Sequence, residues 1–266
     1  MKIRAVFLFM AFLVFFLTKI ASAQDEVTQA ETLDQATVDK IARLAYEQPR
    51  GADSHLHAKM LIVSSSKMKQ NRELDIFRQD WNGRYRNLVK FTKPNDIKGT
   101  GFLTWSYPRK DDVQWLYLPA LGKVRKISLK SKHNSFVGTD FSYDDMRERK
   151  VEEDSFSFVA MKKLLGQDCY VLRATPTKDS RSEYDNMELY IRKDNNYLVG
   201  VRYFKRGKLY KLFLARKLKK IDGIWISHRM EMKNIQKRSK TILDVTETHI
   251  NSGLKDDKFT ERSLSR

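Results

Sequence analysis

Two closely spaced histidines are the first residues in this chain that could do chemistry. His55 and His57 are two positions apart, so on a strand both rings would lie on one face. With a carboxylate beside them they could hold a metal ion. The simpler interpretation, which we favour, is a pair of exposed polar residues that begin a strand after Pro49. The sequence therefore predicts no metal site.

Candidate nucleophiles and acid–base groups are equally sparse. Cys169 is the only cysteine and precedes an apolar run, which is typical of a small core residue; a reactive thiolate would need a neighbouring base. The carboxylates of Asp144 and Asp145 and of residues 152–154 form charge runs of the kind found in solvated turns or helix starts. The sequence has no P-loop, no GxGxxG after a strand, no HExxH and no GxSxG. We therefore expect neither an enzyme nor a bound cofactor.

The N-terminal residues have the pattern of a secretory signal peptide. Basic residues precede an apolar run at 5–17, and Ala-Ser-Ala at 21–23 has the small side chains of a cleavage site. The run of 13 apolar residues is shorter than the ~20 that a membrane-spanning helix needs. We expect cleavage near Ala23, a periplasmic protein, and a single domain over residues 24–266.

The chain is strongly basic. It carries 51 Lys and Arg against 33 Asp and Glu, a net charge of +18, and loss of the three basic residues of the signal leaves +15. Basic runs interleaved with aromatic residues also occur in proteins that bind single-stranded nucleic acid. An exported protein, however, meets anionic lipid headgroups instead. The charge predicts encounters with a membrane surface, or general solubility, and no nucleic-acid partner.

The elements that would position any site are one helix and a series of strands. Val38, Ile41, Leu44 and Ala45 recur at helical spacing, with Asp34 or Thr37 as the N-cap, and Pro49 with Gly51 ends the helix. Pairs at 82–83, 195–196, 206–207 and 222–223 then separate extended runs, and such pairs suit the positive φ angles of tight hairpins. This spacing predicts an antiparallel, up-and-down sheet.

Several of these strands are apolar on both faces. In the run 114–118, Trp115 and Tyr117 would lie on one face and Leu116 and Leu118 on the other. One explanation is a helix layer on one face with partial cover on the other. The alternative is a curled sheet whose concave face lines an apolar cavity. The middle segment, residues 128–160, interrupts the strand pattern; Asp140 or Ser142 could cap a short helix there, and the segment could form a lid.

Two stretches of sequence resemble a known family. They are Lys98–Thr104 with Asp112–Ile127 (KGTGFLT…DVQWLYLPALGKVRKI), and 135–146 (SFVGTDFSYDDM). This pattern is similar to that of the LolA-like family of outer-membrane lipoprotein-sorting proteins, over nearly the whole mature chain. One departure is Lys126, where the family pattern tends to have arginine, so a role that needs a guanidinium fork is in doubt there.

The resemblance implies a half-open antiparallel β-barrel with a helical lid and an apolar cavity. It also implies a carrier of lipid or lipid-modified cargo, some members resembling accessory partners of inner-membrane exporters of the resistance–nodulation–division type. Acyl chains would be buried against aromatic and aliphatic residues, and movement around Gly138 would release them. Arg125 could meet a headgroup or hold a loop closed. Our candidate lining residues are Phe102, Leu103, Trp105, Trp115 and Tyr117, with Phe136, Phe141 and Tyr143 on the lid side.

Two alternatives belong to other classes of protein. A non-carrier adaptor would dock an exporter through its basic surface and would have a filled interior. An exported enzyme acting on an anionic substrate would use the carboxylates and His228, and would show titratable groups converging in a cleft.

Overall fold

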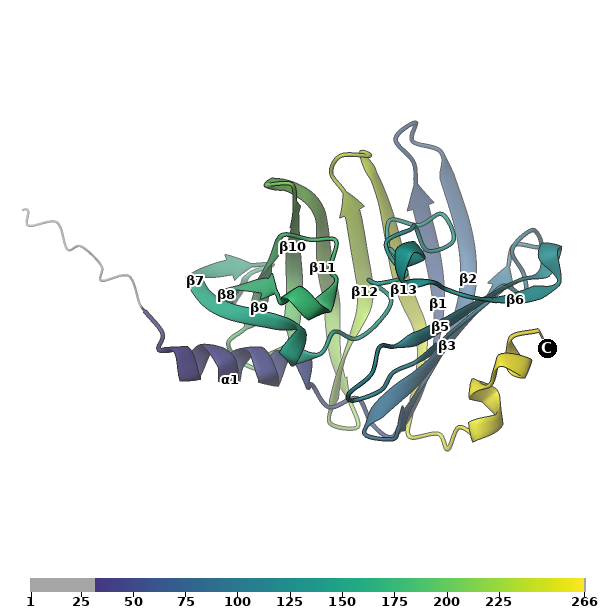
Figure 1. The fold of residues 1–266 in the computed structure, drawn as a ribbon, viewed down its shortest axis with the longest axis horizontal. Helices are drawn as coiled ribbons and strands as arrows, with labels where there is room; N and C mark the ends of the chain where they lie inside the picture. Colours follow the sequence, from purple (N-terminus) through teal and green to yellow (C-terminus); the bar gives the residue numbers. More distant parts are fainter. Residues whose placement is uncertain (1–31, 266) are drawn as a thin grey trace, which may run out of the picture. The chain divides into compact units, whose positions relative to one another are not determined.

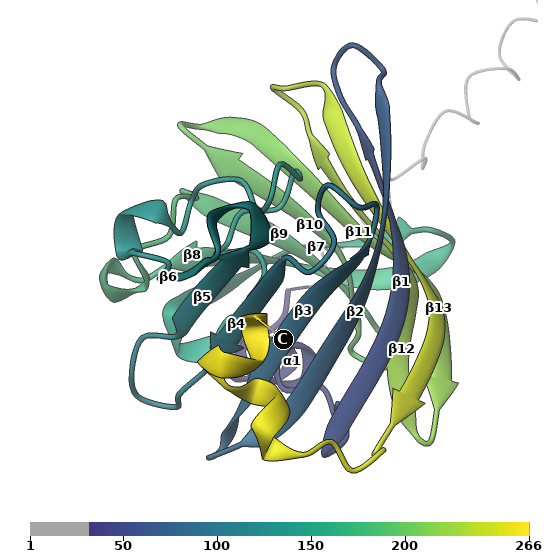
Figure 2. The same ribbon diagram turned by 90° about the vertical axis from the view of Figure 1, so that its right-hand side faces the viewer.

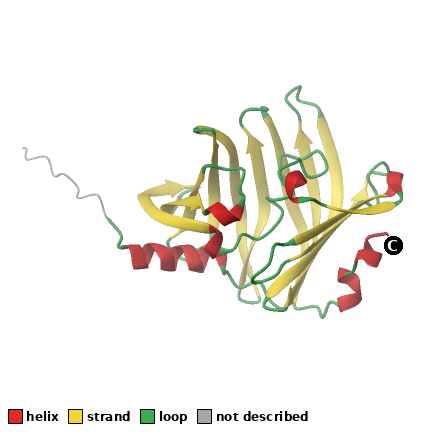
Figure 3. Ribbon diagram, viewed as in Figure 1, coloured by secondary structure: helices red, strands yellow, loops and turns green. Residues whose placement is uncertain are grey.

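A computed structural model describes residues 32–265 of the chain (Figure 3). The predicted signal peptide and its cleavage site lie outside the described residues. Within residues 32–265, no helix has both the length and the apolar character needed to cross a membrane.

The predicted N-terminal helix is present as α1, Gln35–Tyr46. Asp34 is its N-cap: its carboxylate accepts a hydrogen bond of 2.8 Å from the backbone N–H of Thr37, which satisfies a donor that the first helical turn leaves unpaired. Val38, Ile41 and Ala45 are buried as expected, but Leu44 is 43 % exposed. The buried stripe instead includes Ala42, since positions 38, 41, 42 and 45 share one face of the helix, and the helix contacts β7.

One antiparallel sheet of 13 strands makes up most of the structure. The strands are β1 (Asp53–Val63), β2 (Lys69–Trp81), β3 (Arg84–Lys93), β4 (Gly101–Trp105), β5 (Val113–Leu118), β6 (Lys123–Lys126), β7 (Asp154–Leu164), β8 (Gln167–Pro176), β9 (Asn186–Arg192), β10 (Leu198–Lys205), β11 (Lys208–Ile221), β12 (Ile224–Asn234) and β13 (Ser239–Ile250). Neighbours in sequence pair throughout, except that β13 pairs with β1 and that β6 and β7 form the two free edges. The sheet is thus an open, curved meander and not a closed barrel (Figure 1).

The predicted turn pairs connect strands. Asn82 and Gly83 join β2 to β3 with φ of 46° and 72°, and Asp222 and Gly223 join β11 to β12 with φ of 48° and 84°. Both angles are positive, as the two-residue turns of antiparallel hairpins require. The residues at 195–196 and 206–207 likewise lie between strands.

The chain between the two free edges is here called the crossover segment, residues 127–153. It is shorter than the predicted middle segment because residues 154–160 are already part of β7. The short α-helix expected after Asp140 or Ser142 does not form. Ser142 and Asp145 exchange hydrogen bonds between side chain and backbone, but the turn is not continued, and the only helices in the crossover segment are the short 3₁₀ turns Leu129–Ser131 and Val151–Glu153. A helical lid is therefore not seen in the described residues.

The two faces of the sheet are covered by different parts of the chain. The inner face packs against α1 and the crossover segment. On the outer face, residues 254–265 cover β3, β4 and β5 with two 3₁₀ helices, Asp256–Phe259 and Glu261–Ser265 (Figure 2). This double cover explains why these strands are apolar on both faces.

Candidate functional site

A cavity of about 290 Å³ lies on the inner face, between α1, the crossover segment and β9 to β12. Its volume is near the lower end of the roughly 300–1,000 Å³ that is typical of small-molecule sites. The lining residues are Ala45, Tyr46, Gln48, Pro49, Arg50, Phe141, Asp145, Arg147, Glu148, Arg149, Met187, Leu189, Tyr197, Leu198, Val201, Tyr203, Phe213, Ala215, Trp225, Ser227, Met230 and Met232.

The wall formed by the sheet is mostly apolar. Alternate residues of a strand point to the same face, so Met187 and Leu189 of β9 both line the cavity. Phe213 of β11 and Met232, directly opposite it on β12, line it as well. Three of the lining side chains are methionines, which adapt to irregular apolar ligands because the side chain is unbranched and flexible. This wall can take an aliphatic group of variable shape.

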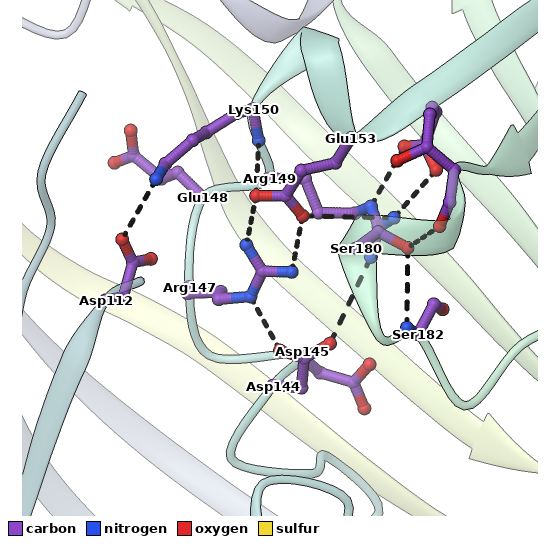
Figure 4. A network of polar contacts seen from close by, with 12 residues as sticks. Asp112, Asp144, Asp145, Arg147, Glu148, Arg149, Lys150, Glu153, Ser180 and Ser182 are labelled. Carbon is purple, nitrogen blue, oxygen red and sulfur yellow. Dashed lines mark hydrogen bonds and ion pairs between the residues drawn. The ribbon is translucent and has the colours of Figure 1, made fainter. Parts of the chain in front are cut away.

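The opposite wall, formed by the crossover segment, is charged. Arg147 is almost fully buried; its Nε donates to Asp144 at 2.6 Å, and its two terminal nitrogens donate to the two carboxylate oxygens of Glu153, each at 2.6 Å (Figure 4). Burial opposes the positive charge, but these carboxylates raise the pKa of Arg147 well above its usual value. Arg149 makes a similar paired contact with Asp154, at 2.7 and 3.0 Å. Such two-point pairs fix the planes of both guanidinium groups.

Glu148 joins the crossover segment to the N-terminal strands. Its carboxylate accepts a hydrogen bond of 2.8 Å from Nε of Arg78, and its backbone carbonyl accepts one of 2.9 Å from Arg84. Its backbone N–H donates a hydrogen bond of 2.7 Å to the hydroxyl of Tyr85. Burial raises the pKa of Glu148, but the charges of Arg50 and Arg78 outweigh that effect and hold it below its usual value. The carboxylate is therefore ionised at neutral pH.

Asp145 joins the same segment to the C-terminal strands. Its Oδ2 lies 2.8 Å from Nζ of Lys211 on β11, and its Oδ1 accepts 2.7 Å from the hydroxyl of Tyr184. The side chains of Asp145 and Lys211 are each only 4 % exposed. Glu148 and Asp145 are three residues apart, so this short part of the crossover segment is bound both to the N-terminal strands, through Arg78 on β2, and to the C-terminal strands, through Lys211 on β11.

The arrangement presents an apolar wall and a charged wall to the same cavity. Titratable groups do converge here, as the enzyme alternative predicted. Each of Asp145, Arg147, Glu148 and Arg149, however, has a partner of opposite charge within the protein. His228, the other group that this alternative would use, is not among the cavity residues.

Four of the predicted lining residues lie on the inner face. Phe102, Phe136 and Tyr143 form an aromatic cluster, in which the Phe102 ring centroid is 5.0 Å from that of Phe136 and 5.6 Å from that of Tyr143. This cluster fills the curve of the N-terminal strands and lies outside the cavity. Only Phe141 lines the cavity.

The other four lie on the outer face, because strand alternation separates them from Phe102. Leu103 and Trp115 pack with Phe259 and Leu264 of the C-terminal 3₁₀ helices. The indole N–H of Trp105 donates a hydrogen bond of 2.8 Å to the carbonyl of Phe259. Tyr117 borders the same cluster. The structure thus divides the eight candidates between two faces and three environments, and ligand contact by any of them stays a prediction.

The remaining candidates are distributed over the sheet. Arg125 is exposed on the edge strand β6, away from the cavity. His55 and His57 do have a carboxylate beside them, because Oδ1 of Asp75 lies 3.0 Å from a ring nitrogen of each. The described residues nevertheless contain no cluster of three or more side chains arranged to hold a metal ion. Cys169 is buried in β8, and burial raises the pKa of its thiol.

Sequence reasoning missed the residues that form most of the cavity. The two-sided apolar pattern was visible in β10 and β11, at Leu198, Val201 and Phe213 as much as at Trp115, so the signal existed but did not favour one half of the sheet. The charged wall was read as solvated turns. Acidic and basic residues alternate in this segment, which connects two sets of strands. That alternation was the available sign that these side chains form ion pairs with one another.

Comparisons with known proteins agree with this architecture. A family model described as "uncharacterized protein" matches residues 83–266. No curated protein matches the chain. Among solved structures, a DUF1329 family protein from Desulfovibrio piger has a TM-score of 0.82 and 29 % identity, covering 86 % of this chain and 98 % of that one.

Two further structures carry descriptive names. A candidate outer membrane lipoprotein-sorting protein domain from Vibrio parahaemolyticus has a TM-score of 0.81 and 29 % identity, covering 88 % of this chain and 100 % of that one. A LolA superfamily protein from Nitrosomonas europaea has a TM-score of 0.66 and 17 % identity over 88 % and 100 %, and this more distant likeness bears on the fold alone. The chain therefore belongs to the family of the matching model, and its fold is similar to that of the LolA superfamily protein.

Proposed function

We propose that this protein is a periplasmic carrier that binds an acyl chain of a lipid or lipoprotein in the cavity between α1, the crossover segment and β9 to β12. The observation that carries the proposal is the cavity itself, with an apolar wall from the sheet and a charged wall from the crossover segment. The name of the Vibrio relative supports the same class of cargo.

The size of the cavity sets what it can hold. At ~30 Å³ per water molecule in the liquid, a volume of 290 Å³ corresponds to about ten waters. We expect it to take part of an acyl chain. Each buried methylene contributes about 0.8 kcal/mol, so roughly ten of them would supply about 8 kcal/mol before ordering costs. That is sufficient for reversible binding, which a carrier needs.

Arg50 is the cavity residue best placed to meet an anionic headgroup. Its side chain is 39 % exposed, and its guanidinium lies 3.3 Å from Glu148, a looser contact than those of the buried Arg147. A phosphate or carboxylate at the mouth could share this cation. Arg147 and Arg149 are instead held by protein carboxylates and would shape the wall.

The adaptor alternative predicts a filled interior, and the cavity favours the carrier. Delivery to or from a resistance–nodulation–division exporter, and release through movement around Gly138, remain parts of the proposal.

The test is native mass spectrometry with lipid extraction on protein purified from periplasm without detergent. A stoichiometric acyl-bearing species is expected. The matched variants are Phe213→Asp and Leu212→Asp, adjacent on β11, of which only Phe213 lines the cavity. Burying a charge in an apolar site is costly, so Phe213→Asp should lose the ligand and Leu212→Asp should keep it. A bare protein mass that takes up no added phospholipid or lipopeptide would refute the carrier, and equal occupancy in both variants would refute this cavity as its site.

A further inference from the structure

Three hairpins lie side by side where neighbouring strands of the sheet end, away from the edge strands β6 and β7. They connect β1 to β2, β12 to β13 and β10 to β11, and both views show their tips at the same edge (Figures 1 and 2). Antiparallel pairing in the order β2-β1-β13-β12-β11-β10 requires this, because each strand reverses the direction of its neighbour. We call the segments 64–70, 233–240 and 205–208 the hairpin edge.

The hairpin edge carries basic residues and no acidic ones. Its three segments contain no Asp or Glu, and the basic residues are Lys67, Lys69, Lys205, Arg206, Lys208, Lys233, Lys237, Arg238 and Lys240. At the opposite edge of the same strands the charges are mixed, with Asp80 near Arg84 and Asp222 near Lys220. The asymmetry is therefore local and is not simply a share of the net charge.

Several of these basic side chains are directly opposite each other on paired strands. Lys233 is directly opposite Lys240, and Lys205 is opposite Lys208. Lys69 and Lys240 flank Val63 from the two neighbouring strands. Strands are ~4.8 Å apart, and like charges directly opposite in a sheet are destabilising. Within residues 32–265, only Lys205 and Lys240 of this set have a carboxylate partner, Glu183 at 2.6 Å and Glu231 at 3.9 Å.

The tip of the first hairpin adds an exposed apolar side chain. Met68 is 65 % exposed. The tip is ordered by hydrogen bonds from the N–H of Ser64 to the carbonyl of Met68 at 3.0 Å and from the N–H of Met68 to the hydroxyl of Ser64 at 3.2 Å. Lys67 and Lys69 flank it. An apolar group among lysines is the pattern of a segment that meets a bilayer interface.

We propose that the hairpin edge docks this protein on an anionic lipid bilayer. Charge complementarity selects the partner, since phosphate headgroups would neutralise the facing lysines while Met68 enters the interface. A Debye length of ~10 Å at 0.1 M salt lets neighbouring hairpins act together on such a surface. The proposal is independent of the carrier function, because the hairpin edge does not include cavity residues.

The experiment is sedimentation of periplasm-purified protein, its N-terminus checked by mass spectrometry, with phosphatidylethanolamine–phosphatidylglycerol vesicles. Vesicles of phosphatidylcholine alone are the neutral comparison. The test variant is Lys69→Gln with Lys237→Gln and Arg238→Gln. The control, Lys162→Gln with Lys219→Gln and Lys220→Gln, removes the same charge from exposed positions outside the hairpin edge.

Each lysine near an anionic surface changes binding up to about fivefold, so we expect the test variant to bind at least ~10-fold more weakly and the control to stay close to wild type. Binding should also disappear at ~1 M salt, where the Debye length is ~3 Å. Wild type that ignores phosphatidylglycerol, or equal loss in both variants, would overturn the proposal; in the latter case net charge alone would explain the binding. A Met68→Ser variant that binds as tightly as wild type would overturn the role of Met68.

Ligand occupancy separates this proposal from the carrier. The test variant should still carry the acyl-bearing species in native mass spectra if the carrier proposal holds. Vesicle binding without any bound lipid would leave the docking edge supported and the carrier refuted.

Discussion

The ion pair between Asp145 and Lys211 should contribute strongly to stability, and removing one partner tests this. In Lys211→Met the carboxylate of Asp145 would stay buried with only the Tyr184 hydroxyl and the backbone N–H of Ser142 as partners. At 2.8 Å and an effective dielectric constant of ~20, the attraction between the two charges is about 6 kcal/mol before desolvation. Removing one partner of a buried pair costs about 3–5 kcal/mol.

Urea unfolding followed by tryptophan fluorescence measures the loss directly. Total stabilities of such domains are about 5–15 kcal/mol, so the midpoint should shift markedly. The double variant Asp145→Asn with Lys211→Met leaves neither charge of this pair, and it should lose about 3 kcal/mol less than the sum of its single variants. Lys208→Met, at an exposed position on the same strand, is the control and should change stability by about 0.5 kcal/mol or less.

A loss below ~1 kcal/mol in Lys211→Met would refute the reasoning. So would full additivity of the two single variants, since it would mean that the two side chains do not interact in the folded protein.

The other predictions concern the outer face, a close contact and acid stability. Trp115→Asp should destabilise the protein by several kcal/mol in thermal unfolding, since it puts a carboxylate under the C-terminal 3₁₀ helices; the variant that still folds should keep its ligand, and selective ligand loss at unchanged stability would instead support a lining role. Gly101→Ala should also lower the melting temperature, because a Cβ there would lie 2.8 Å from Cδ2 of Leu264 and 3.2 Å from its carbonyl oxygen; an unchanged melting temperature would show that the C-terminal residues move aside freely. The pKa of Glu148 is lower in the folded state than in the unfolded chain, where it is 4.5. The ionised carboxylate therefore stabilises the fold fully above pH 4.5, and this stabilisation is lost as the pH falls through the lower pKa of the folded state. Glu148→Gln should flatten the pH dependence of stability below pH 4.5, and an unchanged acid unfolding profile would contradict this.

Much of the secondary structure could be predicted because it depends on local sequence. Asp34 lies next to the backbone N–H that it caps, and the pair Asn82-Gly83 adopts its turn through its own φ preferences. The antiparallel meander follows from such short connections. The helix expected after Asp140 failed for a non-local reason, since Asp145 and Arg147 are bound by Lys211 and Glu153.

The candidate site was less predictable because alternation shows only that a strand has two faces. It does not show what covers each face. Trp115 and Phe213 look alike in sequence, yet one lies beneath the C-terminal residues and the other lines the cavity.

By itself, the sequence determined the class of fold, the position of the helix and four of the hairpin turns, and the likeness to the LolA-like family. These features depend on patterns within a few neighbouring residues, or on contiguous sequence motifs. Only the tertiary structure decided the pairing of β1 with β13, the burial of the crossover segment, and the location of the cavity among β9 to β12. Each depends on contacts between residues far apart in the chain, such as Asp145 with Lys211. The residues around Asp145 alone, or around Lys211 alone, do not show that this contact forms or how much it stabilises the fold.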